Sequence, residues 1–96
     1  MRARQVFRFR DQQGEVTVEM VIWAVPQATA ERPHGLKYRL YCGRAGRCVV
    51  RYDNETGKGD HRHYGRREDP YSFESVEKLL VDFRADCERL AGWKWE

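Results

Sequence analysis

The sequence predicts an α+β fold in which an antiparallel sheet of four to five strands packs against one long C-terminal helix. Apolar and polar residues alternate along several short segments separated by turn residues, as they do in half-buried strands. Near the end of the chain, apolar residues recur every three or four positions, as on one face of a helix. No repeat or shift in composition marks a second domain, so we expect residues 1–96 to form a single domain.

The first two strands are expected in 5–10 and 15–25, on either side of the turn sequence "DQQG". A register with Arg10 opposite Glu15 places the apolar residues of both strands on one face. The next segment, 26–36, contains two prolines and a glycine and is expected to form a loop.

A second hairpin is expected from 37–42 and 47–53, which flank "GRAGR". A register that pairs Cys42 with Cys48 keeps the apolar residues of both strands on one face. The segment "DHRHY" (60–64) also alternates and predicts a short fifth strand with its two histidines on the same face.

The last element is a helix that begins after Ser75, a favourable N-cap residue, and ends before Gly92, at a position where glycine is common. Its apolar stripe consists of Val76, Leu79, Leu80, Phe83, Cys87 and Leu90. The tail "GWKWE" either packs back on the edge of the sheet or presents Trp93 and Trp95, with Tyr41 and Tyr64, for stacking on bases.

Charge is distributed unevenly along the chain. Residues 1–67 carry 14 basic and 7 acidic side chains, whereas residues 68–96 carry 4 basic and 8 acidic ones. Fourteen of the 18 basic residues are arginine, whose planar fork suits phosphate and carboxylate groups. A nucleic-acid or other anionic partner explains this pattern, and so does a genome rich in G and C.

Apolar runs and cysteines in the sequence indicate where in the cell the protein is located. No apolar run approaches the roughly 20 residues that span a bilayer, and no apolar segment of a signal peptide follows the basic start. Three cysteines without a secretory signal indicate reduced thiols. We therefore expect a cytoplasmic protein that does not bind a membrane.

The expected second hairpin places Arg39 opposite Arg51, about 5 Å apart at Cβ. Like charges so placed repel each other unless something between them compensates. A phosphate would do so, which makes the pair a candidate anion site. An acidic side chain such as Glu19, or solvent, would do so equally.

The loop "RYDNETGKGDHRHYG" (51–65) concentrates titratable groups. Cys42, Cys48, His61 and His63 have the donor types of a zinc site, but five residues separate the cysteines where two to four are usual. Alternatively, His61 and His63 could hold a catalytic metal ion together with Asp53 and Asp60. A third possibility is a disulfide between Cys42 and Cys48. The expected hairpin directs both cysteines into the apolar core, so we expect no metal and no cofactor.

Acid–base chemistry on RNA is the other interpretation of this loop. Histidine titrates near neutral pH, so His61 and His63 could take a proton from the 2′-hydroxyl and give one to the leaving oxygen. Cations stabilise the charge that builds up on the phosphate. The candidate phosphate ligands are Lys58, Arg39, Arg51 and Arg62, and Gly57 and Gly59 would let the backbone approach closely.

Two long segments resemble one known family. "LKYRLYCGRAGRCVVRYDNETGKGDHRHYG" and "YSFESVEKLLVDFRAD" share the pattern of the TumE family of bacterial toxins: a "KYRL" strand, a hairpin, "RYDNxxGKGDHRH" and an aromatic-rich lead into an "LLxDF" helix. "EMVIWAVP" is similar to the family's earlier strand, and the resemblance covers about residues 15–86. It implies a cytoplasmic toxin with a helix-turn-helix antitoxin as partner and RNA, often on the ribosome, as target.

The matching motif positions complete the set of candidate residues. The expected catalytic residues are His61, His63, Lys58 and Asp60. The expected RNA- and phosphate-binding residues are Arg39, Arg51, Lys37 and Arg62, and the expected loop-shaping residues are Asp53, Asn54, Gly57 and Gly59.

These observations favour a toxin that acts as a metal-independent endoribonuclease. The alternative is a non-catalytic module whose "GKGDHRH" loop binds a nucleic acid, a protein or an anion. Two docking modes are open for the antitoxin. A basic surface of the antitoxin could bind the acidic segment 68–96. Alternatively, an acidic segment of the antitoxin could cover the face that carries Arg39 and Arg51, the arginine face, and imitate phosphate. We prefer the second mode because it would explain inhibition.

Overall fold

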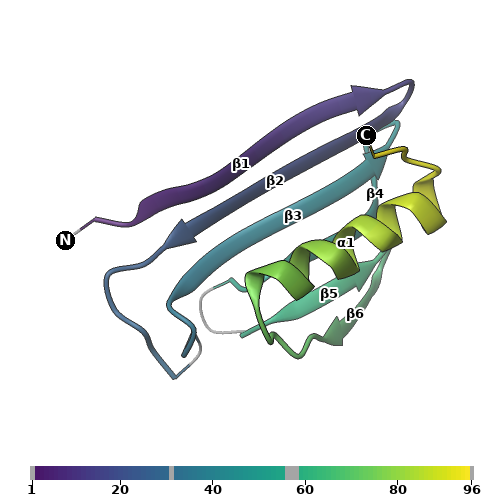
Figure 1. The fold of residues 1–96 in the computed structure, drawn as a ribbon. Helices are drawn as coiled ribbons and strands as arrows, with labels where there is room; N and C mark the ends of the chain where they lie inside the picture. Colours follow the sequence, from purple (N-terminus) through teal and green to yellow (C-terminus); the bar gives the residue numbers. More distant parts are fainter. Residues whose placement is uncertain (1, 31, 56–58, 96) are drawn as a thin grey trace.

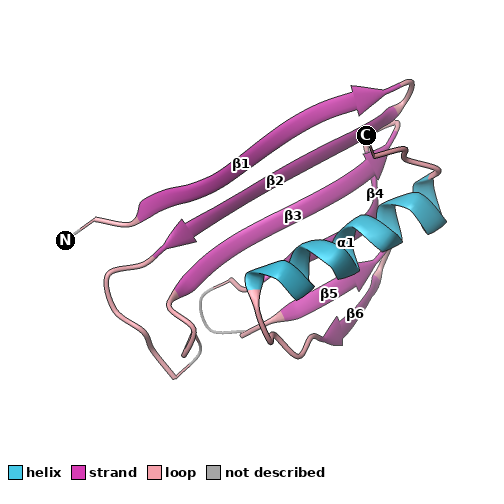
Figure 2. Ribbon diagram, in the orientation of Figure 1, coloured by secondary structure: helices cyan, strands magenta, loops and turns pink. Residues whose placement is uncertain are grey.

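The computed structural model describes residues 2–30, 32–55 and 59–95, and it shows an antiparallel sheet followed by one helix (Figures 1 and 2). The elements are β1 (Arg4–Gln13), β2 (Val16–Ala24), β3 (Leu36–Arg44), β4 (Arg47–Asp53), β5 (His61–Tyr64), β6 (Arg67–Pro70) and α1 (Val76–Ala91). The strands lie in the sheet in the order in which they occur in the sequence. The α+β class is confirmed, and the described sheet has six strands where four to five were expected.

The extra strand is β6, whose sequence "REDP" contains no apolar residue apart from a proline. Proline is tolerated there because β6 is an edge strand and its outer side forms no ladder. Hydrophobic alternation could not reveal a strand of this composition.

Two-residue turns connect the strands of three hairpins: Gly14–Glu15, Ala45–Gly46 and Gly65–Arg66. Ala45 and Gly46 have φ values of 50° and 80°, and two positive φ angles define the tight turn whose twist matches that of the flanking strands. The strands therefore run further toward each turn than the sequence indicated.

The expected register of the first hairpin is wrong for this reason. Arg10 lies opposite Glu19 rather than Glu15, with its Nε 3.4 Å from Glu19 Oε1. The shift of four residues is even, so Phe7 and Phe9 remain on the face that carries the apolar residues of β2.

The expected register of the second hairpin is also wrong, by two residues. Arg39 lies opposite Asp53, and Arg51 lies opposite Tyr41. Val49 has no partner in β3, which makes it the extra residue of a β-bulge. The two arginines are therefore not paired with each other, and Asp53, which lies opposite Arg39, forms an ion pair with Arg51.

Helix α1 covers one face of the sheet and packs on β3 and β4 (Figure 1). Beneath it lies a core of buried side chains from the inward positions of the strands and the helix. Its largest fully buried members are Tyr52, Phe83, Ile22, Leu40, Leu79, Val18 and Val50. The opposite face of the sheet has no element packed on it among the described residues (Figure 2).

The ends of α1 lie where the sequence placed them. The Ser75 side chain accepts a hydrogen bond from the Lys78 amide at 3.0 Å, and Gly92 ends the helix with φ 69°. The apolar stripe differs at its C-terminal end, because Leu90 is 38% exposed while Asp86 and Ala91 are buried.

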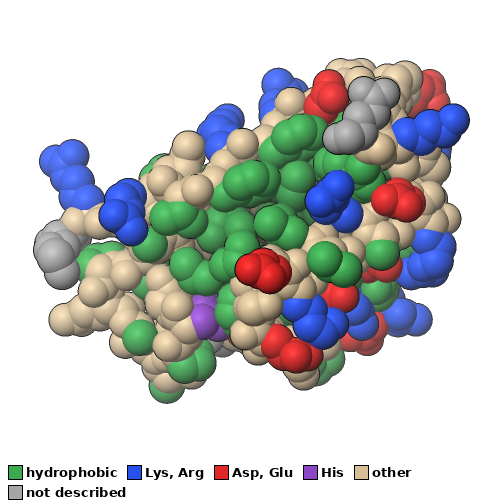
Figure 3. Space-filling model, in the orientation of Figure 1, with side chains coloured by type: hydrophobic (Ala, Val, Ile, Leu, Met, Phe, Trp, Pro, Cys, Tyr) green, Lys and Arg blue, Asp and Glu red, His purple; other side chains and the backbone are tan. Residues whose placement is uncertain are grey.

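The tail after α1 folds back on the first hairpin, as one of the two expectations had it. Trp93 is buried, and the Trp95 ring lies 5.6 Å from that of Phe9. The side chain of Gln13 both donates to the Lys94 carbonyl at 2.8 Å and accepts from the Lys94 amide at 3.0 Å. Apolar side chains remain visible between this hairpin and the helix (Figure 3).

Candidate functional site

The open face of the sheet carries two rows of side chains that run across the strands. The backbone register places Arg8, Val21, Arg39, Asp53, His61 and Pro70 in one row. The second row consists of Arg10, Glu19, Tyr41, Arg51, His63 and Glu68. Because side chains on one strand alternate between faces, these rows bring together residues from all six strands.

His63, on β5, contacts three charged side chains on this face. Its Nε2 lies 3.1 Å from Arg51 Nη2, 3.1 Å from Glu68 Oε2 and 3.7 Å from Asp53 Oδ1. A neutral ring with its proton on Nδ1 accepts at Nε2 from Arg51, and a ring protonated at Nε2 donates to Glu68. The same nitrogen can therefore accept or donate a proton, depending on which neighbour it contacts.

Asp53 holds Arg51 in this position. The carboxylate is 5% exposed and its Oδ2 lies 2.8 Å from Arg51 Nε, an ion pair in which the N–H is not aligned as a hydrogen bond. A guanidinium beside a buried carboxylate is fixed in orientation and presents its remaining N–H groups to the open face.

The second histidine on this face, His61, has a defined tautomer. Its Nδ1 lies 3.0 Å from the carbonyl oxygen of Gly59, which can only accept. Nδ1 therefore carries the proton, and in the neutral ring Nε2 is the acceptor. Gly59 has φ 72°, a conformation that favours glycine.

Tyr41 and Arg39 extend the site along β3. The Arg39 guanidinium lies 5.0 Å from the centre of the Tyr41 ring. A Cβ at Gly43 would lie 2.1 Å from the Tyr41 hydroxyl, so the missing side chain of Gly43 gives the ring its place. Burial raises the pKa of Tyr41, which remains a neutral hydrogen-bond donor at neutral pH.

Asn54 shapes the backbone at the end of β4. It is 1% exposed; its Oδ1 accepts from the Tyr38 amide at 2.9 Å, and its Nδ2 donates to the Leu36 carbonyl at 2.7 Å. The side chain thus continues the ladder between β3 and β4 by one step, immediately after Asp53. Lys37 is exposed at the start of β3, opposite Trp23.

Asp60 lies in a different cluster, with a histidine that the sequence did not single out. It accepts from the Tyr38 hydroxyl at 2.6 Å and from His34 Nε2 at 3.1 Å. His34 Nδ1 accepts from the Leu36 amide, so Nε2 must be the protonated nitrogen in the neutral ring. The His34 ring packs 4.0 Å from that of Phe73, and burial with the Asp60 hydrogen bond raises the pKa of Tyr38.

Arg62 points to the helix side. Val50, Tyr52 and the residues paired with them face α1, so the alternation of β5 directs Arg62 and Tyr64 away from the two histidines. Arg62 lies over the rings of Tyr52, Tyr64 and Tyr71, at 5.6, 5.1 and 5.8 Å from their centres.

The structure therefore brings His61, His63, Arg39, Arg51 and Asp53 to one face, and it separates Asp60 and Arg62 from them. Lys58 and Gly57 lie outside the described residues. Of the four aromatic residues considered for base stacking, Tyr41 alone is on the open face. Glu68 was missed because it lies on the strand that the sequence did not reveal.

The alternative metal and disulfide sites are not assembled. Cys42 is buried in the core, Cys48 is half-buried, and all three cysteines are free. Within 2–30, 32–55 and 59–95, no three His, Cys, Asp or Glu side chains are placed to hold one metal ion.

The comparisons with known proteins identify the family. A family model described as Toxin TumE matches residues 2–91. The chain belongs to the TumE toxin family. Comparison with curated proteins found no match, and comparison with solved structures found none either.

Membership in the TumE family indicates that the protein is the toxin of a toxin–antitoxin pair. The family therefore also implies an antitoxin as partner. The match begins at residue 2 and so extends the resemblance across β1 and the end of α1. The helix of the described structure is 16 residues long and carries charged residues, and it does not qualify as a bilayer span.

Proposed function

We propose that this TumE-family toxin is a metal-independent endoribonuclease whose site is the open face of the sheet. The observation that carries the proposal is the contact between His63, Arg51 and the two carboxylates of Asp53 and Glu68, with His61 two residues away on the same strand. Two histidines on one exposed surface, beside an oriented guanidinium, are the groups that cleavage of RNA by its own 2′-hydroxyl requires.

We assign His61 as the base, because its Nδ1–H donates to Gly59 and its Nε2 is left to accept the proton of the 2′-hydroxyl. The 2′-oxygen then forms a bond to phosphorus while the bond from phosphorus to the 5′-oxygen breaks. His63, protonated at Nε2 and placed beside Glu68, gives its proton to that leaving oxygen. The products are a 2′,3′-cyclic phosphate and a free 5′-hydroxyl.

Arg51 and Arg39 are the expected ligands of the phosphate. Asp53 fixes Arg51, and the Tyr41 ring supports Arg39. When Arg51 donates to a phosphate oxygen, it leaves Nε2 of His63, which then faces Glu68.

Cleavage of a labelled RNA, with and without EDTA and with and without ribosomes, tests the proposal. His61→Ala and His63→Ala are each expected to lower the rate by about 100-fold or more, the usual contribution of a general acid or base. The matched control is His34→Ala, because this histidine lies on the other side of the sheet and should leave cleavage unchanged.

A pH profile separates the two roles. The native rate should fall at low pH, where the base is protonated, and at high pH, where the acid has lost its proton. Residual activity of His61→Ala should lack the fall at low pH, and that of His63→Ala should lack the fall at high pH. Intact RNA in every reaction would leave a toxin that binds without cleaving, and EDTA-sensitive cleavage would require a metal mechanism.

A further inference from the structure

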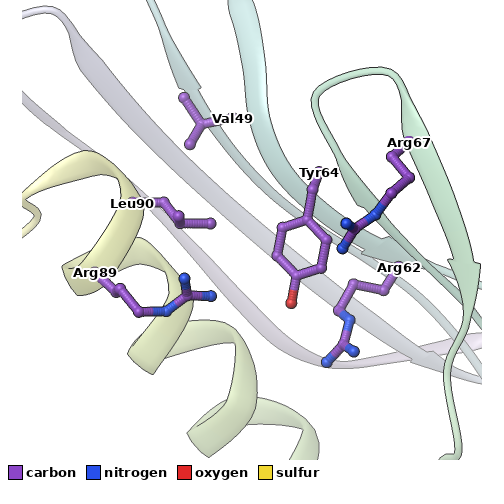
Figure 4. A pocket seen from close by; sticks show the side chains of 6 residues that line it. All are labelled: Val49, Arg62, Tyr64, Arg67, Arg89 and Leu90. Atoms are coloured by element: carbon purple, nitrogen blue, oxygen red, sulfur yellow. The ribbon is translucent and has the colours of Figure 1, made fainter.

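A pocket of about 480 Å³ lies on the helix side of the sheet, opposite the proposed site (Figure 4). The strands supply Val49, Arg62, Tyr64 and Arg67, and α1 supplies Arg89 and Leu90. Figure 4 shows the helix residues directed toward the ring of Tyr64. The pocket therefore combines three guanidinium groups with an apolar lining.

The fold exposes this apolar lining in two ways. Val49 is the extra residue of the bulge in β4, and it lies on the helix side although its neighbour Val50 already fills the core there. Leu90 departs from the buried stripe of α1 and is 38% exposed. Leu90 lies outside the core and Val49 is only partly buried at its margin, so both present apolar surface to the pocket.

The three arginines are only partly compensated. Arg67 Nε lies 3.1 Å from Asp69, and Arg89 Nη2 lies 2.8 Å from Asp86. Arg62 lies over tyrosine rings, and its Nε is buried without a hydrogen bond to the described residues. Three positive charges face two carboxylates, which leaves the pocket attractive to one further acidic group.

These features favour a protein carboxylate over a nucleic acid. Two guanidiniums, of Arg62 and Arg67, already lie within about 5 Å of the centre of the Tyr64 ring, so the ring is not open for stacking on a base. Asp69 and Asp86 flank the pocket and would repel a chain of phosphates. A single Asp or Glu beside an apolar side chain meets neither obstacle and fits both parts of the lining.

We propose that this pocket binds an acidic segment of the antitoxin, in which a carboxylate contacts Arg67 and Arg89 while a neighbouring apolar side chain packs on Val49 and Leu90. The inference rests on the antitoxin that the family implies and not on ribonuclease activity. It moves the docking site from the arginine face, where we expected it from the sequence, to the helix side.

The pocket is linked to the proposed site through β5. Arg62 and Tyr64 line the pocket, and His61 and His63, which alternate with them on the same four-residue strand, face the other side. An antitoxin segment held in the pocket thus contacts the strand that carries both histidines without covering them.

Binding of the purified antitoxin to the full-length toxin, measured by titration calorimetry, tests the inference. Arg67 and Arg89 have largely exposed side chains, so Arg67→Glu and Arg89→Ala should keep the fold, and denaturant unfolding of both variants checks this. Each is expected to weaken binding about tenfold or more. Arg66→Glu is the matched control, because Arg66 lies in the same hairpin and outside the pocket; it should change Kd less than threefold. Leu90→Asp tests the apolar half and should also weaken binding about tenfold.

Three results would overturn the inference. One is unchanged affinity in the pocket variants, and another is an equal loss in Arg66→Glu, which would indicate a general charge effect. The third is a loss of RNA binding in the pocket variants while antitoxin binding is kept, which would make the pocket a nucleic-acid site. RNA cleavage is measured separately, so failure of the ribonuclease proposal leaves this test unaffected.

Discussion

The two faces of the sheet are built from the same strands but treat their charged groups differently. On the helix side, Asp86 accepts hydrogen bonds from Tyr52, Tyr64 and Arg89, and two of these donors are themselves packed under Arg62. On the open side, Asp53 lies 2.8 Å from Arg51 Nε and 3.7 Å from His63 Nε2, and that arginine also contacts the imidazole of His63.

The comparison teaches what a buried carboxylate contributes in each place. Asp86 has three donors converging on its two oxygens, so it fixes strands to helix and its network is complete. Asp53 positions a guanidinium whose other N–H groups face an open surface. A complete network contributes mainly to stability, whereas an oriented charge on an open surface can act on a ligand.

Truncating one residue on each side should separate these contributions most strongly. Phe83 is fully buried on α1, edge-to-face with Tyr52, and Phe83→Ala should lower the free energy of unfolding by about 3–5 kcal/mol. His63→Ala should change it by less than about 1 kcal/mol, since its side chain lies on the open face, where no described element packs. Denaturant unfolding of both variants checks this. A large loss in His63→Ala would mean that the cluster on the open face is structural.

The two buried aspartates provide a second pair. Asp86→Asn keeps the shape but weakens three hydrogen bonds to a charged group, and it should cost about 2 kcal/mol of stability with cleavage retained. Asp53→Asn releases Arg51 and should lower RNA cleavage about tenfold with a smaller effect on stability. Thermal unfolding and cleavage assays on both variants would contradict the distinction if the two effects were reversed.

Acid should weaken the helix side through Asp82. Burial opposes its ionisation, but hydrogen bonds from the Tyr71 hydroxyl at 2.7 Å and from Lys78 outweigh this and hold the pKa of Asp82 below its ordinary value. A lowered pKa stabilises the fold above pH about 4, and this contribution is lost as the pH falls further. Asp82→Asn should therefore be less stable than the native protein at pH 6 and show a shallower loss below pH 4. The free energy of unfolding is measured with urea at each pH. An equal loss below pH 4 in the variant and the native protein would contradict the prediction.

The smallest expected effect lies at the turn between β3 and β4. Ala45 has φ 50°, a conformation that is unfavourable for alanine and well tolerated by asparagine. Ala45→Asn should raise stability by about 0.5 kcal/mol and leave cleavage unchanged, because the turn is remote from the two histidines. A lower melting temperature would show that the tight turn is not what limits this hairpin.

The alternation of side chains was predictable from the sequence, and the registers were not. Both hairpin errors were even numbers of residues, so most side chains were still assigned to the correct face. Cys48 is an exception: it was expected in the core with Cys42, but the bulge places it opposite Gly43 on the open face and turns its neighbour Val49 to the helix side. The tight turn at Ala45 escaped prediction because alanine rarely adopts a positive φ, and the bulge at Val49 has no sequence signal of its own.

The candidate site was predictable only as far as this alternation was applied. It placed His61 and His63 together, and the same reasoning, carried one residue further, separates Arg62 from them. Grouping Asp60 and Arg62 with the histidines by proximity in the chain ignored the pleat of the strand. His34 and Glu68 could not be placed, because one lies in a loop and the other on a strand without apolar residues.

The order of the elements has a consequence for synthesis of the chain. Helix α1 and the tail that joins Gln13 to Lys94 follow all six strands, so the ribosome completes the sheet before it makes the segment that covers its apolar face. Until then Phe7, Phe9 and the inward residues of β2 to β4 have no cover, and exposed apolar strands invite aggregation. A chain truncated before Val76 should therefore accumulate in the insoluble fraction. The nascent protein is protected from aggregation only once α1 and the tail have emerged from the ribosome.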